Sequence, residues 1–166
     1  MSSAAEALQS TLSERIAARD RSGAVTAALD AVRAGSVTLP ELYDILAAHL
    51  IAVGSSWQSG ETEVWQEHYA TAVVRTIVEA CHPLAAEQAA APNGLSVVFA
   101  TPPEEYHDLG LRMIADRFTL AGWTAHLLGA SMPTDELLDA VSELGVDAVV
   151  LSAYTHFHRL ALKTYV

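Results

Sequence analysis

The segment Glu105-x-His107-x-x-Gly110 combines residue types that can prepare a metal ligand, and Ser152 follows it after 41 intervening residues. The Glu105 carboxylate can accept the proton of one ring nitrogen of His107, which fixes the tautomer and makes the other nitrogen a better metal ligand. Gly110 allows a ligand to approach the start of the next helix closely. Zinc needs at least three protein ligands, which a single histidine does not provide. We therefore expect His107 to suit a metal whose other positions are filled by a macrocycle.

A second group lies upstream, where Trp57 is followed after nine intervening residues by the adjacent pair Glu67 and His68. Taken alone, Trp57 is more simply a core aromatic residue, and Glu67-His68 an ordinary pair on a helix. The two groups lie in segments that are typical of different secondary structure. This difference indicates two protein faces that close on one large planar ligand.

The composition is typical of a globular chain without a basic surface. Hydrophobic residues make up 51% of the sequence and charged residues 17%, enough for a buried core. The net charge is −11 and the nine Lys and Arg residues are scattered, so we expect no direct binding of nucleic acid or of an anionic membrane. The single cysteine, Cys81, excludes an intrachain disulfide. The N-terminus lacks the features of a signal peptide and no apolar run approaches the roughly 20 residues of a membrane span, so we predict a cytoplasmic protein.

The first half of the chain has the apolar periodicity of helices. Hydrophobic residues recur three and four positions apart over residues 4–84, which predicts four or five helices. Ser59 is predicted to cap the start of the last helix. Short connections favour an antiparallel bundle, so we predict a four-helix domain over residues 1–88. A linker of small residues and turn formers is expected over 85–94.

The second half alternates between strand and helix patterns. We predict strands at 95–100, 123–128 and 146–152, with helices at 109–121 and 134–144. This order is typical of a flavodoxin-like parallel α/β domain, here over residues 93–166, so the fold class is α + α/β. Ligands of such sheets bind outside the carboxyl ends of the strands, which is where the Glu105-His107 segment and Ser152 are expected.

These residues resemble a known family motif. Glu105-x-His107-x-x-Gly110, followed by Ser152, is similar to the acidic-x-His-x-x-Gly and Ser-x-Leu motif of cobalamin-binding domains. The resemblance implies that His107 displaces the dimethylbenzimidazole base of cobalamin and binds cobalt from below. It implies further that Glu105 orients His107 and that Ser152 lines the slot for the displaced base. Tyr154 stands where the motif usually has leucine, which changes the expected shape of that slot.

A second departure concerns the C-terminus. The family pattern continues with a Gly-Gly turn roughly 25 to 30 residues after the serine, and this sequence ends at Val166 before such a turn. We therefore expect the 93–166 domain to be incomplete at its C-terminus, without its fourth and fifth strands.

The helical half resembles the cap domain of the same superfamily. Trp57, Val64 and the Glu67-His68 pair have the spacing found in CarH-type adenosylcobalamin photoreceptors. The resemblance implies that these residues line the upper face of the cofactor. Trp57 would pack over the adenosyl side, Glu67 would contact the adenosyl group, and His68 would take the upper cobalt position after light breaks the cobalt–carbon bond.

This resemblance predicts a light sensor. Adenosylcobalamin would lie between the helical cap and the α/β domain, and photolysis would change the arrangement of domains or of a homo-oligomer. CarH-type repressors carry a DNA-binding domain that this sequence lacks, so the signal is expected to pass to an output domain or a partner protein. We expect a cofactor-binding module rather than an enzyme.

Two alternatives stay open at this point. A corrinoid methyl carrier of a methyltransferase system would share Glu105, His107 and Ser152 and would need no residues for an adenosyl group. A photocobilin-type sensor would hold a bilin, such as biliverdin, as well as cobalamin. The extra His156 and His158 and the lack of a DNA-binding domain agree loosely with the second alternative.

Overall fold

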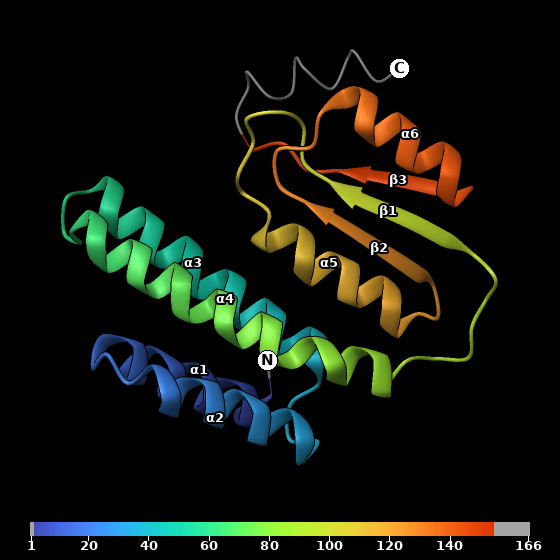
Figure 1. The fold of residues 1–166 in the computed structure, drawn as a ribbon. Coiled ribbons are helices and arrows are strands. Elements are labelled where there is room, and N and C mark those ends of the chain that lie inside the picture. The colour runs from blue at the N-terminus through green and yellow to red at the C-terminus, as the bar shows by residue number, and fades with distance from the viewer. Residues whose placement is uncertain (1, 155–166) are drawn as a thin grey trace. The chain divides into compact units, whose positions relative to one another are not determined.

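The computed structural model describes residues 2–154 of the chain (Figure 1). It divides into two compact units, Met1–Leu84 and Ala85–Val166. In chain order the elements are α1 (Ser3–Ala17), α2 (Arg21–Arg33), α3 (Leu39–Gln58), α4 (Val64–Glu87), β1 (Ser96–Ala100), α5 (Leu109–Leu120), β2 (Thr124–Gly129), α6 (Thr134–Leu144) and β3 (Ala148–Leu151). In residues 2–154, no helix is both long and apolar enough to cross a membrane.

The first unit is built from amphipathic helices with side-chain caps. Ser2 and Asp20 accept backbone N–H groups in the first turns of α1 and α2. Thr38 and Glu41 form a reciprocal capping box at the start of α3, which explains why that helix begins at Leu39. The buried faces bring together apolar side chains spaced three or four residues apart, among them Leu8, Leu12, Leu42, Ile45, Leu46, Val73, Val74 and Ile77.

Two expectations about the last helix of this unit are wrong. Ser59 is the C-terminal cap of α3 and not the start of α4, which begins five residues later at Val64. The helix also continues to Glu87, past the expected start of the linker at residue 85, although it contains Pro83. Proline removes one backbone hydrogen bond, but the alanines that follow favour helix strongly enough to extend it.

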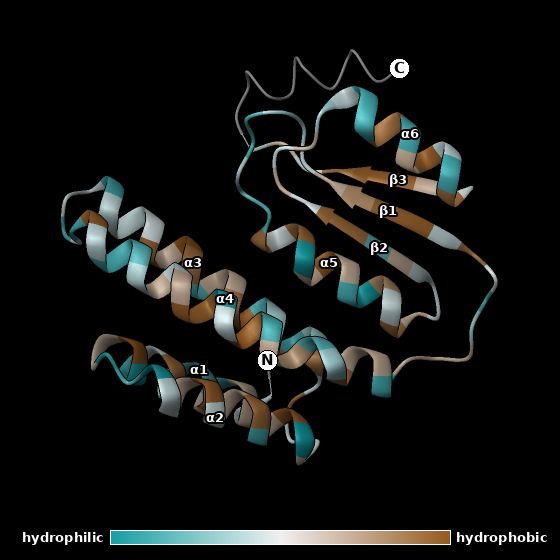
Figure 2. Ribbon diagram, viewed as in Figure 1, coloured by the Kyte–Doolittle hydropathy of each residue, from teal (hydrophilic) through white to brown (hydrophobic). Residues whose placement is uncertain are grey.

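The second unit is a parallel sheet of three strands in the order β2-β1-β3. Figure 2 shows β1 and β3 to be mostly hydrophobic. Val97 and Phe99 of β1 pack on the side of α5, whereas Val98 and Ala100 pack on the side of α6. Both faces of β1 are therefore covered, as expected for a continuous apolar run in a parallel sheet. The predicted fold class, a four-helix unit followed by a flavodoxin-like parallel α/β unit, is confirmed.

The central position of β1 decides where a ligand can approach the second unit. The chain crosses from β1 to β2 on one side and returns to β3 on the other, so the order of the sheet reverses at β1. Loops that leave neighbouring strands in opposite directions open a crevice at the carboxyl ends. The segment between Ala100 and Leu109 starts at this edge and contains the Glu105-His107 motif.

Candidate functional site

Glu105 and His107 form a close pair at the carboxyl edge of the sheet. The Glu105 side chain is fully buried, and its Oε1 lies 2.5 Å from Nδ1 of His107 and accepts the backbone N–H of His107 at 3.0 Å. The His107 side chain is 65% exposed. With Nδ1 directed at the carboxylate, the ring presents Nε2 outward. This is the arrangement that prepares a histidine to bind a metal.

The end of β3 completes the surroundings of this carboxylate. The backbone N–H of Tyr154 donates to Oε2 of Glu105 at 2.8 Å. The Tyr154 ring packs on the imidazole of His107 with centroids 4.7 Å apart and planes tilted by 32°. Ser152 continues the pairing with β1, because its N–H donates to the carbonyl of Ala100. Tyr154 thus restrains both the carboxylate and the imidazole, a role that its position in the sequence motif did not indicate.

Thr101 and Ser131 also support the site, and sequence analysis did not single them out. The Thr101 hydroxyl donates to the carbonyl oxygen of Glu105, which also accepts the N–H of Ser131 at 3.0 Å. The N–H of Ser131 lies 2.9 Å from the Thr101 hydroxyl as well. These contacts join the loop after β1 to the loop after β2. A threonine directly after an apolar strand is the one local signal that could have suggested this support.

Gly110 lies in the first turn of α5, three residues after His107. A Cβ at Gly110 would meet no atom within 4 Å. The space at Gly110 is therefore open, and the approach of a ligand to this helix start stays a prediction. In residues 2–154 no group of three or more His, Cys, Asp and Glu side chains is arranged to hold a metal ion. A metal at His107 would have to bring most of its ligands with it.

A second carboxylate–histidine pair lies in the helical unit. Near the start of α4, Oε2 of Glu67 lies 2.6 Å from Nδ1 of His68, and Oε1 accepts the hydroxyl of Thr71 at 2.8 Å. The His68 side chain is 74% exposed, while that of Glu67 is 27% exposed. Nε2 of His68 is therefore directed away from its carboxylate partner, as in the Glu105–His107 pair. The common geometry prepares both imidazoles as metal ligands.

Trp57 and Val64 lie at the same end of the helical unit as His68. Trp57 is near the end of α3 and Val64 begins α4, and the short connection between these helices is seen in Figure 1. Trp57 is 47% exposed and Val64 is 51% exposed. Trp57 taken alone was expected to be a core aromatic residue. Its exposure shows that it is not buried in the core. Large apolar side chains left this exposed are available to cover a ligand.

The structure thus groups the candidate residues within each unit. Glu105, His107, Ser152 and Tyr154 meet at one edge of the sheet, and Gly110 is beside them on α5. Trp57, Val64, Glu67 and His68 gather around the turn from α3 to α4. His156 and His158, which were considered in connection with a bilin, lie outside the described residues.

The support given by Glu105 can be measured without any ligand. Glu105→Gln replaces one acceptor oxygen by an amide that faces backbone N–H donors, so we expect the free energy of unfolding to fall by about 1 to 3 kcal/mol. Chemical denaturation followed by circular dichroism measures this change. The matched control is Glu104→Gln, an exposed neighbour, for which a change within about 0.5 kcal/mol is expected. Equal stability of the two variants would contradict the proposed support.

Comparison with known proteins gives a consistent result for both units. Residues 95–165 match a family model described as a B12 binding domain, and residues 8–82 match a second model with the same description. The chain is 37% identical over 131 residues to the HTH-type transcriptional repressor CarH of Myxococcus xanthus, covering 77% of this chain and 42% of the repressor. It is 39% identical over 62 residues to the D-ornithine 4,5-aminomutase subunit beta of Acetoanaerobium sticklandii, covering 35% of this chain and 8% of that subunit.

The chain spans less than half the length of both curated relatives. Among solved structures, the monomethylamine corrinoid protein of Methanosarcina barkeri is similar with a TM-score of 0.79 at 17% sequence identity, covering 93% of this chain and 73% of that protein. At this identity the likeness concerns the fold alone.

Proposed function

Because the chain belongs to the B12-binding proteins, with both of its units matching B12 binding domains, we propose that it is a light sensor that uses adenosylcobalamin. The observation that carries this proposal is the second carboxylate–histidine pair, Glu67 and His68, on the helical unit. A protein that only carries a corrinoid needs one such pair, below the cobalt. A second prepared imidazole is useful where the upper ligand of the cobalt is lost and replaced.

On the lower side, His107 is the proposed cobalt ligand. Glu105 holds Nδ1 of the ring, and its other oxygen accepts the N–H of Tyr154, so the carboxylate contacts both the segment after β1 and the segment after β3. An anchored carboxylate accepts the proton on Nδ1 and so fixes the tautomer and the orientation in which Nε2 points outward, which raises its affinity for a metal. Ser152 and Tyr154, at the end of β3, are proposed to line the slot for the displaced dimethylbenzimidazole. The larger ring of Tyr154 makes this slot narrower than leucine would.

On the upper side, the residues around the turn from α3 to α4 are proposed to face the cofactor. Bound adenosylcobalamin supplies a cobalt–carbon bond that light can break. Trp57 and Val64 would exclude water and pack on the adenosyl group, which Glu67 would contact. His68 would occupy the upper position once the adenosyl group has left. The resulting shift of α4 is the proposed output, passed to another copy of the chain or to a partner protein.

Ligand preference gives a direct test of the upper face. We expect the chain to bind adenosylcobalamin more tightly than methylcobalamin in the dark, because Trp57 and Glu67 contact a group that methyl lacks. Trp57→Ala should bind the two cofactors nearly equally. Titration followed by absorption spectroscopy measures both affinities. Trp65→Ala is a matched control, because Trp65 is similarly exposed on α4 and should leave the preference unchanged.

The same titration separates the light sensor from a corrinoid methyl carrier, and a second measurement separates it from a photocobilin-type sensor. A preference for methylcobalamin in the unmodified chain would contradict the sensor and favour a corrinoid methyl carrier. A protein purified with both cobalamin and biliverdin that shows a bilin absorption band and responds to red light would favour the photocobilin-type sensor.

Size-exclusion chromatography with light scattering, in darkness and after green light, tests the proposed change in domain or oligomer arrangement. An unchanged mass and hydrodynamic radius would contradict a change in domain or oligomer arrangement.

A further inference from the structure

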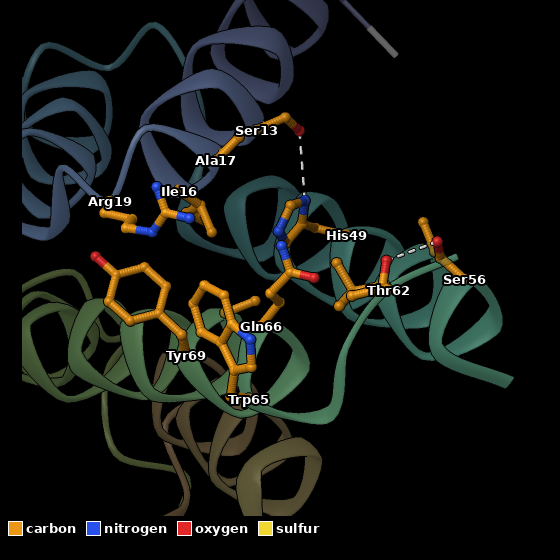
Figure 3. Close-up of a pocket in the computed structure, with 13 residues that line it drawn as sticks. Ser13, Ile16, Ala17, Arg19, His49, Ser56, Thr62, Trp65, Gln66 and Tyr69 are labelled. Atoms are coloured by element: carbon orange, nitrogen blue, oxygen red, sulfur yellow. Dashed lines mark hydrogen bonds between the residues drawn. The ribbon is translucent and has the colours of Figure 1, made fainter. Parts of the chain in front are cut away.

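The helical unit contains a pocket of about 330 Å³ between α1, α3 and α4 (Figure 3). This volume is at the lower end of the range for small-molecule sites, roughly 300 to 1,000 Å³. The α4 side chains that line it include Trp65, Gln66 and Tyr69. With about 3.6 residues per turn, Glu67 lies on the side of α4 away from Trp65 and Tyr69, whereas His68 lies on the side next to Trp65. None of the residues that line the pocket is one of those proposed to bind cobalamin.

One polar atom in the pocket has no partner. Nε2 of His49 is buried and forms no hydrogen bond within residues 2–154, while its Nδ1 lies 3.3 Å from the hydroxyl of Ser13. Burial lowers the pKa of His49, which keeps the imidazole neutral at pH 7. An unpartnered buried nitrogen is costly, and native structures usually provide such an atom with a partner. In the tautomer whose Nδ1–H donates to the hydroxyl of Ser13, Nε2 is an acceptor, and a ligand that donates a hydrogen bond to it would provide the partner.

The pocket also has aromatic walls and a cation. The guanidinium carbon of Arg19 lies 5.3 Å from the centre of the Trp65 ring, and within residues 2–154 Arg19 forms no ion pair. Arg19 has a backbone φ of 63°, a conformation that non-glycine residues seldom adopt, because it joins α1 directly to α2. In Figure 3, Arg19 and Tyr69 lie toward one end of the pocket, His49 lies near its middle, and Thr62 and Ser56 lie toward the other end. The rings of Trp65 and Tyr69 therefore form an aromatic surface between the guanidinium of Arg19 and Nε2 of His49.

We propose that this pocket binds a small planar aromatic carboxylate that carries an N–H or O–H group. The ring would lie against Trp65 and Tyr69, the carboxylate would pair with Arg19, and the N–H or O–H would donate to Nε2 of His49. This site does not depend on bound cobalamin. It uses the cation of Arg19 in a chain whose net charge of −11 otherwise disfavours anions.

Isothermal titration calorimetry of the full chain with indole-3-acetate tests the proposal. We expect saturable binding with Kd below about 1 mM, with and without cobalamin. Tryptamine, which has a cation in place of the carboxylate, and 1-methylindole-3-acetate, which lacks the N–H, should each bind about 10-fold more weakly or worse. Equal binding of tryptamine, or no saturation by indole-3-acetate up to several millimolar, would overturn the proposal.

Two variants assign the contacts. Arg19→Gln and His49→Phe should each weaken indole-3-acetate binding about 10-fold, whereas Arg33→Gln, at the end of α2, should not change it. His49→Phe removes an unpartnered nitrogen and keeps a ring, so its thermal midpoint should stay equal or rise. If His49→Phe does not fold, Arg19→Gln still tests the site. Unchanged affinity in every folded variant would show that indole-3-acetate binds elsewhere and overturn the proposal.

Discussion

His107→Ala is expected to weaken cobalamin binding by about 10- to 100-fold and to leave any bound cofactor in its base-on form. The change removes the lower cobalt ligand that Glu105 holds in position through Nδ1 at 2.5 Å. Loss of a metal ligand or of its supporting partner typically costs this much affinity. Equilibrium titration measures the affinity, and the absorption spectrum distinguishes base-on from base-off cobalamin.

Ser152→Ala is the control for this experiment. Ser152 is proposed to line the slot for the displaced base without touching cobalt, so its affinity should change by a few-fold at most. His107→Ala protein with unchanged affinity and an unchanged base-off spectrum would exclude His107 as the lower ligand. It would also leave the buried Glu105 without a functional explanation.

The second large effect concerns light. Illumination of the unmodified chain with adenosylcobalamin is expected to give a stable product in which His68 and His107 both bind cobalt. Six-coordinate cobalt with two protein ligands has no easily exchanged position, so this product should resist cyanide and should not revert in darkness. Nε2 of His68 is prepared for this role, because Glu67 occupies Nδ1 at 2.6 Å.

His68→Ala should still respond to light, because cleavage of the cobalt–carbon bond belongs to the cofactor. Its product should carry water in the upper position and bind cyanide readily. His82→Ala, an exposed histidine farther along α4, is the control and should behave like the unmodified chain. Identical spectra of the unmodified chain and His68→Ala after illumination would contradict the sensor and favour the methyl carrier.

Much of this architecture follows from local patterns in the sequence. The apolar run at residues 95–100 predicts a strand buried on both faces, and the structure confirms it in β1. The pairs Glu105–His107 and Glu67–His68 are two residues or one residue apart, so each meets through local geometry alone. Short-range patterns therefore sufficed to predict the fold class, whereas the family resemblance was needed to nominate His68, and the roles of both histidines as cobalt ligands stay predictions.

What the sequence could not indicate depends on contacts between distant segments. The hydrogen bond from Tyr154 to Glu105 joins residues 49 positions apart, and it exists because β3 lies beside β1. The contact between Thr101 and Ser131 depends likewise on the pairing of β1 with β2. The unpartnered nitrogen of His49 becomes visible only when three helices pack around it. Local sequence patterns indicated which residues are candidate metal ligands. Only the packing of strands and helices determined which backbone and side-chain groups position those residues, because these partners are distant in sequence.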